Sequence, residues 1–375
     1  MVEVKKKVRN SNYELMRIVS MFLIVLYHVI HHGGTINLSV NPICKEILHL
    51  LELVTIVHVN SFILVTGYFQ SEGKFRLSKL FELMALSFFY KFVIIIIFSY
   101  FDIIDLSKTQ ILNELSPIEI VQNWYFKYYM FLYMLSPFIN IGLNNLSKKN
   151  YLKLIGVLFV IFSIIPICTG GIGMENTGFT LYHFIYLYIV GAYLKKYPVD
   201  KEELIKKLSK LKCRLILIGI MIVCILFNYV LYKCSYKFMG VNSLIDSFCW
   251  HYRNYNMLYS NPLIVIQSLA YFILFGTFSF SNKIVNHISK ITFGIYLLHD
   301  NSHVRLNIYK WMNIDGELIY SLRYFIYVFI IALIVFVGSF IIDSFRSWIC
   351  YYIKKNKYVV RFENWLDKFK ICDVE

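Results

Sequence analysis

The stretch Arg17-Ile-Val-Ser-Met-Phe-Leu-Ile-Val-Leu-Tyr-His28 is apolar enough to enter a bilayer, yet it begins with an arginine and ends with a histidine. His28 follows Arg17 by 11 residues. At about 100° per residue, the two side chains lie on one face of a helix, about 16.5 Å apart along its axis. Exposing a cation and an imidazole to lipid costs several kcal/mol. We therefore predict that both face a protein interior or a wet cavity and belong to a functional site.

The composition is that of a membrane protein. Hydrophobic residues make up 58% of the chain and charged residues 16%, and the mean hydropathy is +0.58, which is too apolar for a soluble fold. Stretches long enough to span a bilayer lie at about residues 14–32, 51–70, 81–101, 124–141, 152–169, 179–195, 213–232, 257–279, 291–309 and 322–345. The sequence predicts an all-α, polytopic membrane bundle of about ten transmembrane helices, located in the plasma membrane.

Basic residues distinguish the two sides of the predicted bundle. Loops that follow the first, third and fifth spans contain at most one lysine or arginine each, whereas the loop at 195–214 carries eight such residues and the segment after the last span is also basic. The loops after the seventh and ninth spans are exceptions, with Lys233, Lys237, Arg253, Arg305 and Lys310. Because basic residues are enriched on the cytoplasmic side, we predict that both termini are cytoplasmic. The formal net charge of +15 has the same explanation, so we predict no nucleic-acid partner.

Five motifs occur in register with this topology. They are Tyr13-Glu14-Leu15-Met16-Arg17 with His28, Gly67-Tyr68-Phe69, Arg76-Leu-Ser-Lys79, the segment from Trp124 to Asn140, and Gly294-Ile-Tyr-Leu-Leu-His299. With these motifs the chain resembles the integral-membrane acyltransferase family 3, whose members O-acylate extracytoplasmic carbohydrates. The resemblance covers nearly the whole chain. We assign residues 1–350 to a membrane acyltransferase domain and residues 351–375 to a short basic cytoplasmic tail.

The resemblance implies an O-acetyltransferase that uses acetyl-CoA, or another short acyl-CoA, as its co-substrate. We expect Arg17, Arg76 and Lys79 to bind the donor phosphates at the cytoplasmic mouth, although Lys79 replaces an arginine of the family motif and loses bidentate contact. The pantetheine arm then reaches His28, which we expect to be the general base for the acceptor hydroxyl, with Arg17 as the second catalytic residue. A nucleophilic His28 that forms an acyl-imidazole is a competing mechanism.

The expected acceptor is an extracytoplasmic glycan, such as a capsular polysaccharide or exopolysaccharide, and other glycan-biosynthesis proteins are possible partners. Trp124 is a candidate for stacking on a sugar ring, but aromatic residues are also enriched at membrane interfaces. His299 and Asp300 are candidates for binding sugar hydroxyls. Asp300 has a second candidate role, which is to orient an imidazole, and the pair also fits a simple polar helix end.

Other readings compete with these assignments. Arg17 could be a snorkelling residue whose only role is to orient the first span. Arg76 and Lys79 could be basic residues that only set the membrane topology. His28, His31 and His32 share a helix face, but no carboxylate or cysteine accompanies them in the sequence, so we predict no metal. A polysaccharide or lipid-linked sugar exporter is the alternative function, and it would need no base at position 28.

Overall fold

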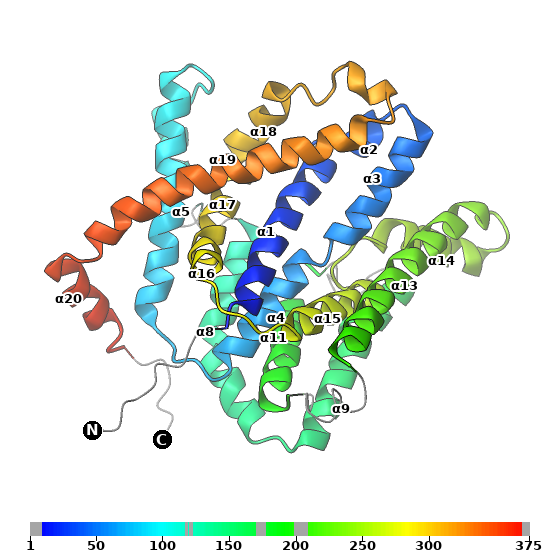
Figure 1. Cartoon of the computed structure of the whole chain (residues 1–375), viewed down its shortest axis with the longest axis horizontal. Coiled ribbons are helices and arrows are strands. Elements are labelled where there is room, and N and C mark those ends of the chain that lie inside the picture. Colours follow the sequence, from blue (N-terminus) through cyan, green and yellow to red (C-terminus); the bar gives the residue numbers. More distant parts are fainter. Residues whose placement is uncertain (1–9, 117–118, 120–122, 170–177, 199–208, 370–375) are drawn as a thin grey trace.

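The computed structural model describes residues 10–116, 119, 123–169, 178–198 and 209–369, and every regular element in these ranges is a helix (Figure 1). In the first half of the chain the elements are α1 (Asn12–His31), α2 (Thr35–Leu38), α3 (Pro42–Thr55), α4 (His58–Gln70), α5 (Leu77–Tyr100), α6 (Lys108–Glu114), α8 (Trp124–Asn144), α9 (Lys148–Phe159), the π-helix η1 (Val160–Ile164), α10 (Ile165–Thr169) and α11 (Leu181–Lys196). In the second half they are α13 (Lys210–Lys237), α14 (Ser243–Tyr255), α15 (Pro262–Gly276), α16 (Lys283–Ile288), the 3₁₀-helix η2 (Ser289–Ile291), α17 (Thr292–His299), α18 (Ser302–Trp311), the 3₁₀-helix η3 (Glu317–Tyr320), α19 (Tyr324–Ile353) and α20 (Lys357–Leu366).

Six of the ten predicted spans coincide with a helical segment that is long and apolar enough to cross a membrane. These segments are Asn12–His31, Pro42–Gln70, Leu77–Tyr100, Lys148–Cys168, Lys210–Lys237 and Tyr324–Ile353. The other four predicted spans coincide with α8, α11, α15 and the α17–α18 pair, which are shorter or less apolar. An all-helical membrane protein is therefore confirmed, whereas the number of ten spans and the sidedness of the termini stay predictions.

The predicted span at 291–309 is not a single helix. α17 ends at His299, and α18 begins after Asn301, whose side chain accepts a hydrogen bond from the backbone N–H of His303 at 3.0 Å. Asparagine is a favoured helix N-cap because its side chain satisfies a backbone N–H that has no partner in the first turn. The break places Asp300 in an irregular segment beside α1 rather than in a regular helix.

The first helix occupies the middle of the bundle. α1 contacts α3, α4, α15, α16, α17 and α19, and it lies near the middle of the bundle in Figure 1. Most of its side chains are consequently buried, including Met16, Val25 and Ile30. α1 therefore faces protein on most sides, as the placement of an arginine and a histidine in this helix predicts.

α4 and α11 form the most extensive contact between two helices in the described part of the chain, and they approach closely at two glycines. A Cβ added to Gly67 would lie 2.1 Å from the backbone oxygen of Tyr188, and one added to Gly191 would lie 2.2 Å from the backbone oxygen of Leu64. Small residues let two helix backbones approach closely, which maximises van der Waals contact within a membrane. The glycine of the Gly67-Tyr68-Phe69 motif is therefore explained by helix packing.

We predict that Gly67→Ala destabilises the protein, because the added methyl group forces α4 and α11 apart, at a typical overpacking cost of about 1–3 kcal/mol. Gly219→Ala in α13 is the matched control, since no atom lies within 4 Å of a Cβ built there. Replacing a glycine within a helix by alanine otherwise stabilises by roughly 0.5–1 kcal/mol. Thermal unfolding of both variants in detergent should give a lower melting temperature for Gly67→Ala only. Equal melting temperatures would show that the glycine contact is not needed.

Candidate functional site

A cavity of about 270 Å³ lies between α1, α4, α5, α8 and the η2–α17 segment. α1 contributes Arg17, Met21, Ile24 and His28, which follow one another at intervals of four, three and four residues. This spacing is one face of an α-helix. The prediction that Arg17 and His28 share a face and border the same interior space is confirmed, and the unbroken helix keeps them about 16.5 Å apart along its axis.

At one end of the cavity, two histidines from distant parts of the chain are hydrogen-bonded. His28 Nδ1 lies 3.0 Å from His299 Nε2, and His299 Nδ1 lies 2.7 Å from the carbonyl oxygen of Ile295. A carbonyl only accepts, so His299 Nδ1 carries a hydrogen, and the Nε2 of a neutral His299 is then an acceptor. His28 Nδ1 must therefore donate to it. This leaves the Nε2 of a neutral His28 with a free lone pair.

That second nitrogen is available for chemistry. His28 Nε2 has no hydrogen-bond partner in the part of the chain that the structure describes, and the His28 side chain borders the cavity. A neutral imidazole with an oriented, unpartnered nitrogen is the usual form of a histidine base. The hydrogen-bond pattern therefore gives His28 the tautomer that proton abstraction requires.

Asp300 lies next to this pair but is already engaged. Its carboxylate accepts hydrogen bonds from Arg305 at 3.1 Å and from Asn123 at 3.3 Å, and its Oδ1 lies 3.6 Å from His28 Nδ1. The side chain is 6% exposed. A buried carboxylate beside a histidine stabilises the imidazolium that forms when the ring takes up a proton. Of the two predicted roles for Asp300, orienting an imidazole fits this geometry better than binding sugar.

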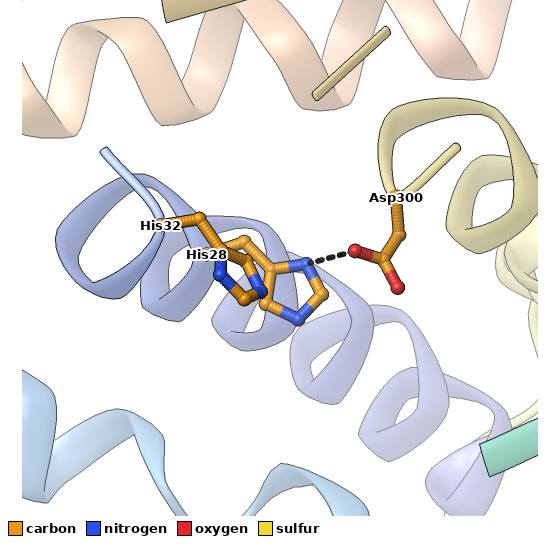
Figure 2. Close-up of side chains that lie close together, drawn as sticks. All are labelled: His28, His32 and Asp300. Carbon is orange, nitrogen blue, oxygen red and sulfur yellow. Dashed lines mark ion pairs between the residues drawn. The ribbon is translucent and has the colours of Figure 1, made fainter. Parts of the chain in front are cut away.

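The fold also brings a carboxylate to the histidines of α1, which the sequence did not indicate. Figure 2 shows Asp300 directed at His28, with His32 alongside, and the possible metal-ligand atoms of the three residues lie within 4.8 Å of one another. The argument that no carboxylate accompanies these histidines is thus wrong. Two histidines and a carboxylate can hold a transition metal. However, a metal on His28 Nδ1 requires the opposite tautomer and breaks the hydrogen bond to His299.

The other end of the cavity is cationic. Arg17 donates to Glu14 at 3.2 Å, and its guanidinium carbon lies 5.7 Å from the ring centroid of Phe69. The Lys79 ammonium lies 5.0 Å from the ring centroid of Tyr133. Both cations border the cavity. The predicted phosphate ligands Arg17 and Lys79 therefore share one space with His28.

Arg76 is not among the residues that border the cavity. Its Nε donates to Asp367 at 2.9 Å, and the backbone N–H of Ser78 donates to the same carboxylate at 2.9 Å. Burial raises the pKa of Asp367, but hydrogen bonds from Ser78 and Arg76 outweigh that effect and lower it below its usual value. Residues 351–375, predicted as a basic tail, thus include the end of α19 and α20, and the residue that follows α20 binds the start of α5.

Trp124 also borders the cavity, where it packs among aromatic rings. Its ring is stacked on Tyr259, with centroids 5.9 Å apart and an interplanar angle of 23°, and it meets Phe179 edge-on. The hydroxyl oxygen of Tyr259 in turn lies 3.0 Å from Nε2 of His58, and Nδ1 of His58 contacts the carbonyl oxygen of Thr55. The aromatic wall is compatible with either predicted role for Trp124, as a sugar platform or as an interfacial side chain.

α17, which carries His299, is seated on α19 through a glycine. A Cβ on Gly294 would lie 2.1 Å from the carboxyl group of Asp343. Asp343 is fully buried, and it accepts hydrogen bonds from Tyr90 and Arg346, each at 2.5 Å. A buried carboxylate is stable only when it is paired and hydrogen-bonded in this way. The glycine of the Gly294–His299 motif therefore allows α17 to rest on this cluster.

Several residues that complete the site could not be identified from the sequence. Arg305 and Asn123 hold Asp300, and Lys290 borders the cavity at its cationic end. Asn123 is 177 residues from Asp300, and Arg305, only five residues from it, is separated from it by the start of α18, so no regular helix spacing identifies either residue. Lys290 resembles any basic residue that flanks an apolar helix, and only its position beside Arg17 and Lys79 distinguishes it.

A family model described as an acyltransferase domain matches residues 10–344 of the chain. The match extends over all the cavity residues and over the five motifs. No curated protein and no solved structure matches the chain.

The hydrogen-bonding of the histidines predicts how the site responds to zinc. We expect the purified protein, exposed to one equivalent of Zn²⁺ and desalted, to retain no more zinc than His32→Ala does. Zinc on His28 Nδ1, the nitrogen that faces Asp300, would break the His28–His299 hydrogen bond. Elemental analysis of both proteins measures this. One zinc per chain in the unmodified protein, lost in His32→Ala, would show that the three-residue cluster is a metal site.

Proposed function

The chain belongs to acyltransferase family 3, and we propose that it transfers an acetyl or other short acyl group from acyl-CoA to a hydroxyl of an extracytoplasmic glycan. One observation carries this proposal. A single cavity joins the cations Arg17 and Lys79 at one end to the unpartnered nitrogen of His28 at the other. Acyl-CoA has a matching arrangement of groups, with negatively charged phosphates at one end and the reactive thioester at the far end of the pantetheine arm.

In the proposed reaction His28 acts as a general base. Its Nε2 accepts the proton of the acceptor hydroxyl while the hydroxyl oxygen attacks the thioester carbonyl carbon. A C–O bond forms, the C–S bond then breaks, and the CoA thiolate leaves with the proton that His28 has taken up. His299 keeps Nδ1 of His28 protonated throughout, and the carboxylate of Asp300, 3.6 Å away, stabilises the transient imidazolium. General base catalysis of this kind contributes about 10² to 10⁴ in rate.

The two ends of the cavity correspond to two substrates from opposite sides of the membrane. We infer that the Arg17 end opens to the cytoplasm, where acyl-CoA is made, because basic loops and both predicted termini lie on that side. The His28 end then faces the extracytoplasmic side. For a protein of the plasma membrane, a capsular polysaccharide or exopolysaccharide is the acceptor that fits this direction of transfer. Other glycan-biosynthesis proteins would deliver it.

We predict that His28→Ala abolishes O-acetylation of surface polysaccharide while leaving polymer yield unchanged, because the base is lost and the fold is not. Proton NMR of polysaccharide from cells with the intact gene, a deletion and His28→Ala at equal protein level measures both quantities. His31→Ala is a matched control from the same helix, and it should retain acetylation because His31 contacts Glu52 rather than His299. Persistent acetylation with reduced polymer export in the deletion would instead identify a transporter.

We predict that His299→Ala lowers kcat roughly 10²-fold and leaves the KM for acetyl-CoA unchanged, because His28 is no longer held in the reactive tautomer. His299→Gln should recover part of kcat, since its side-chain oxygen can accept the hydrogen bond from His28 Nδ1. The control is His303→Ala on α18, where His303 pairs with Glu114 at 2.9 Å and not with His28. Initial rates with varied acetyl-CoA test this. Equal losses in His299→Ala and His303→Ala would exclude a specific role for His299.

A further inference from the structure

Lys290 is a cavity residue to which no role has yet been given. It lies in η2, directly before α17, and borders the same end of the cavity as Arg17 and Lys79. We propose that Lys290 is the third cation of a phosphate site for the acyl donor, made by Arg17, Lys79 and Lys290. The inference rests on the proposed function, because it assumes a CoA thioester as the donor.

The charge of the cavity is one-sided. Among the described residues that border it, three are cationic and none is a carboxylate. Arg17 has a partner in Glu14, and Lys79 lies over the ring of Tyr133. Lys290 has neither an ion pair nor a hydrogen bond in the described part of the chain. Three cations at one end of a cavity that no described carboxylate borders fit a ligand with several negative charges.

Lys290 and Arg17 lie at similar distances from the histidine pair, by two separate paths along the chain. Arg17 precedes His28 by about 16.5 Å along α1, and Lys290 precedes His299 by roughly 14 Å along η2 and α17. The histidine ends of these paths are joined by the 3.0 Å hydrogen bond. Beyond Arg17 and Lys290, the Oγ of Ser11, just before α1, donates to Asn286 in α16 at 2.8 Å, and η2 itself contacts α1. The η2–α17 segment therefore runs beside α1, and the two cations lie at one level.

This separation suits the acyl donor. Half of a typical hydrocarbon core of about 30 Å is roughly 15 Å, and the pantetheine arm is of that order. Phosphates bound between Arg17, Lys79 and Lys290 would leave the thioester within reach of His28. A lysine contributes a point charge on a flexible stem, which suits phosphates that turn as the arm enters the cavity. With Lys290, the η2–α17 segment that leads to His299 carries a cation, as α1 does with Arg17.

The test is binding of CoA to the full chain in lipid nanodiscs, measured without any acceptor. We expect Lys290→Ala to weaken CoA binding roughly ten-fold, the usual loss for one charge-assisted contact, and Lys290→Arg to bind within about two-fold of the unmodified protein. The matched control is Lys283→Ala, an exposed lysine at the start of α16 that does not border the cavity. It should leave CoA affinity unchanged.

Salt dependence provides the second readout. CoA affinity should fall as potassium chloride rises from about 50 to 500 mM, and it should fall less steeply in Lys290→Ala because one ionic contact has been removed. Unchanged affinity in Lys290→Ala, or an equal loss in Lys283→Ala, would overturn the assignment of Lys290 while leaving the proposed function intact. If the unmodified protein binds no CoA at any salt concentration, the proposed function itself fails, and the assignment of Lys290 fails with it.

Discussion

The site depends on the hydrogen bond between His28 and His299. A polar ring inside an apolar helical bundle is costly unless it has a hydrogen-bond partner. Here each histidine is the hydrogen-bond partner of the other. The bond joins α1 to α17 across 271 residues of chain, and through Ile295 it determines which nitrogen of each ring carries a hydrogen. Asp300, Arg305 and Asn123 gather around the same bond. This contact therefore sets how the two rings are oriented at the end of the cavity.

The sequence predicted those features that depend on spacing within a helix. Arg17 and His28 lie in one unbroken helix, so counting residues is sufficient to place both on one face. The apolar stretches likewise indicated the six long helices, since length and hydropathy are local properties. Family motifs added Lys79 and His299, whose places in the site have no basis in local spacing. About half of the site was therefore accessible before the fold was known.

The remaining half depends on contacts that only the fold creates. Lys290 borders the cavity because η2 runs beside the start of α1, and Asp367 reaches Arg76 because α20 turns back onto α5. No periodicity encodes either contact. The predicted helix at 291–309 was wrong for a similar reason. Hydropathy averages over Asp300 and Asn301, whereas capping by a single asparagine is enough to end one helix and begin another.

The contact between Gly294 and Asp343 has an evolutionary consequence. Because the carboxyl group fills the space where a side chain at position 294 would begin, the two positions are not free to vary separately. A homologue with alanine at 294 must have a smaller residue at 343, and its counterparts of Tyr90 and Arg346 then lose the carboxylate that they share. Asp343 does not border the cavity, yet an alignment of relatives should show position 343 changing together with the segment that carries His299.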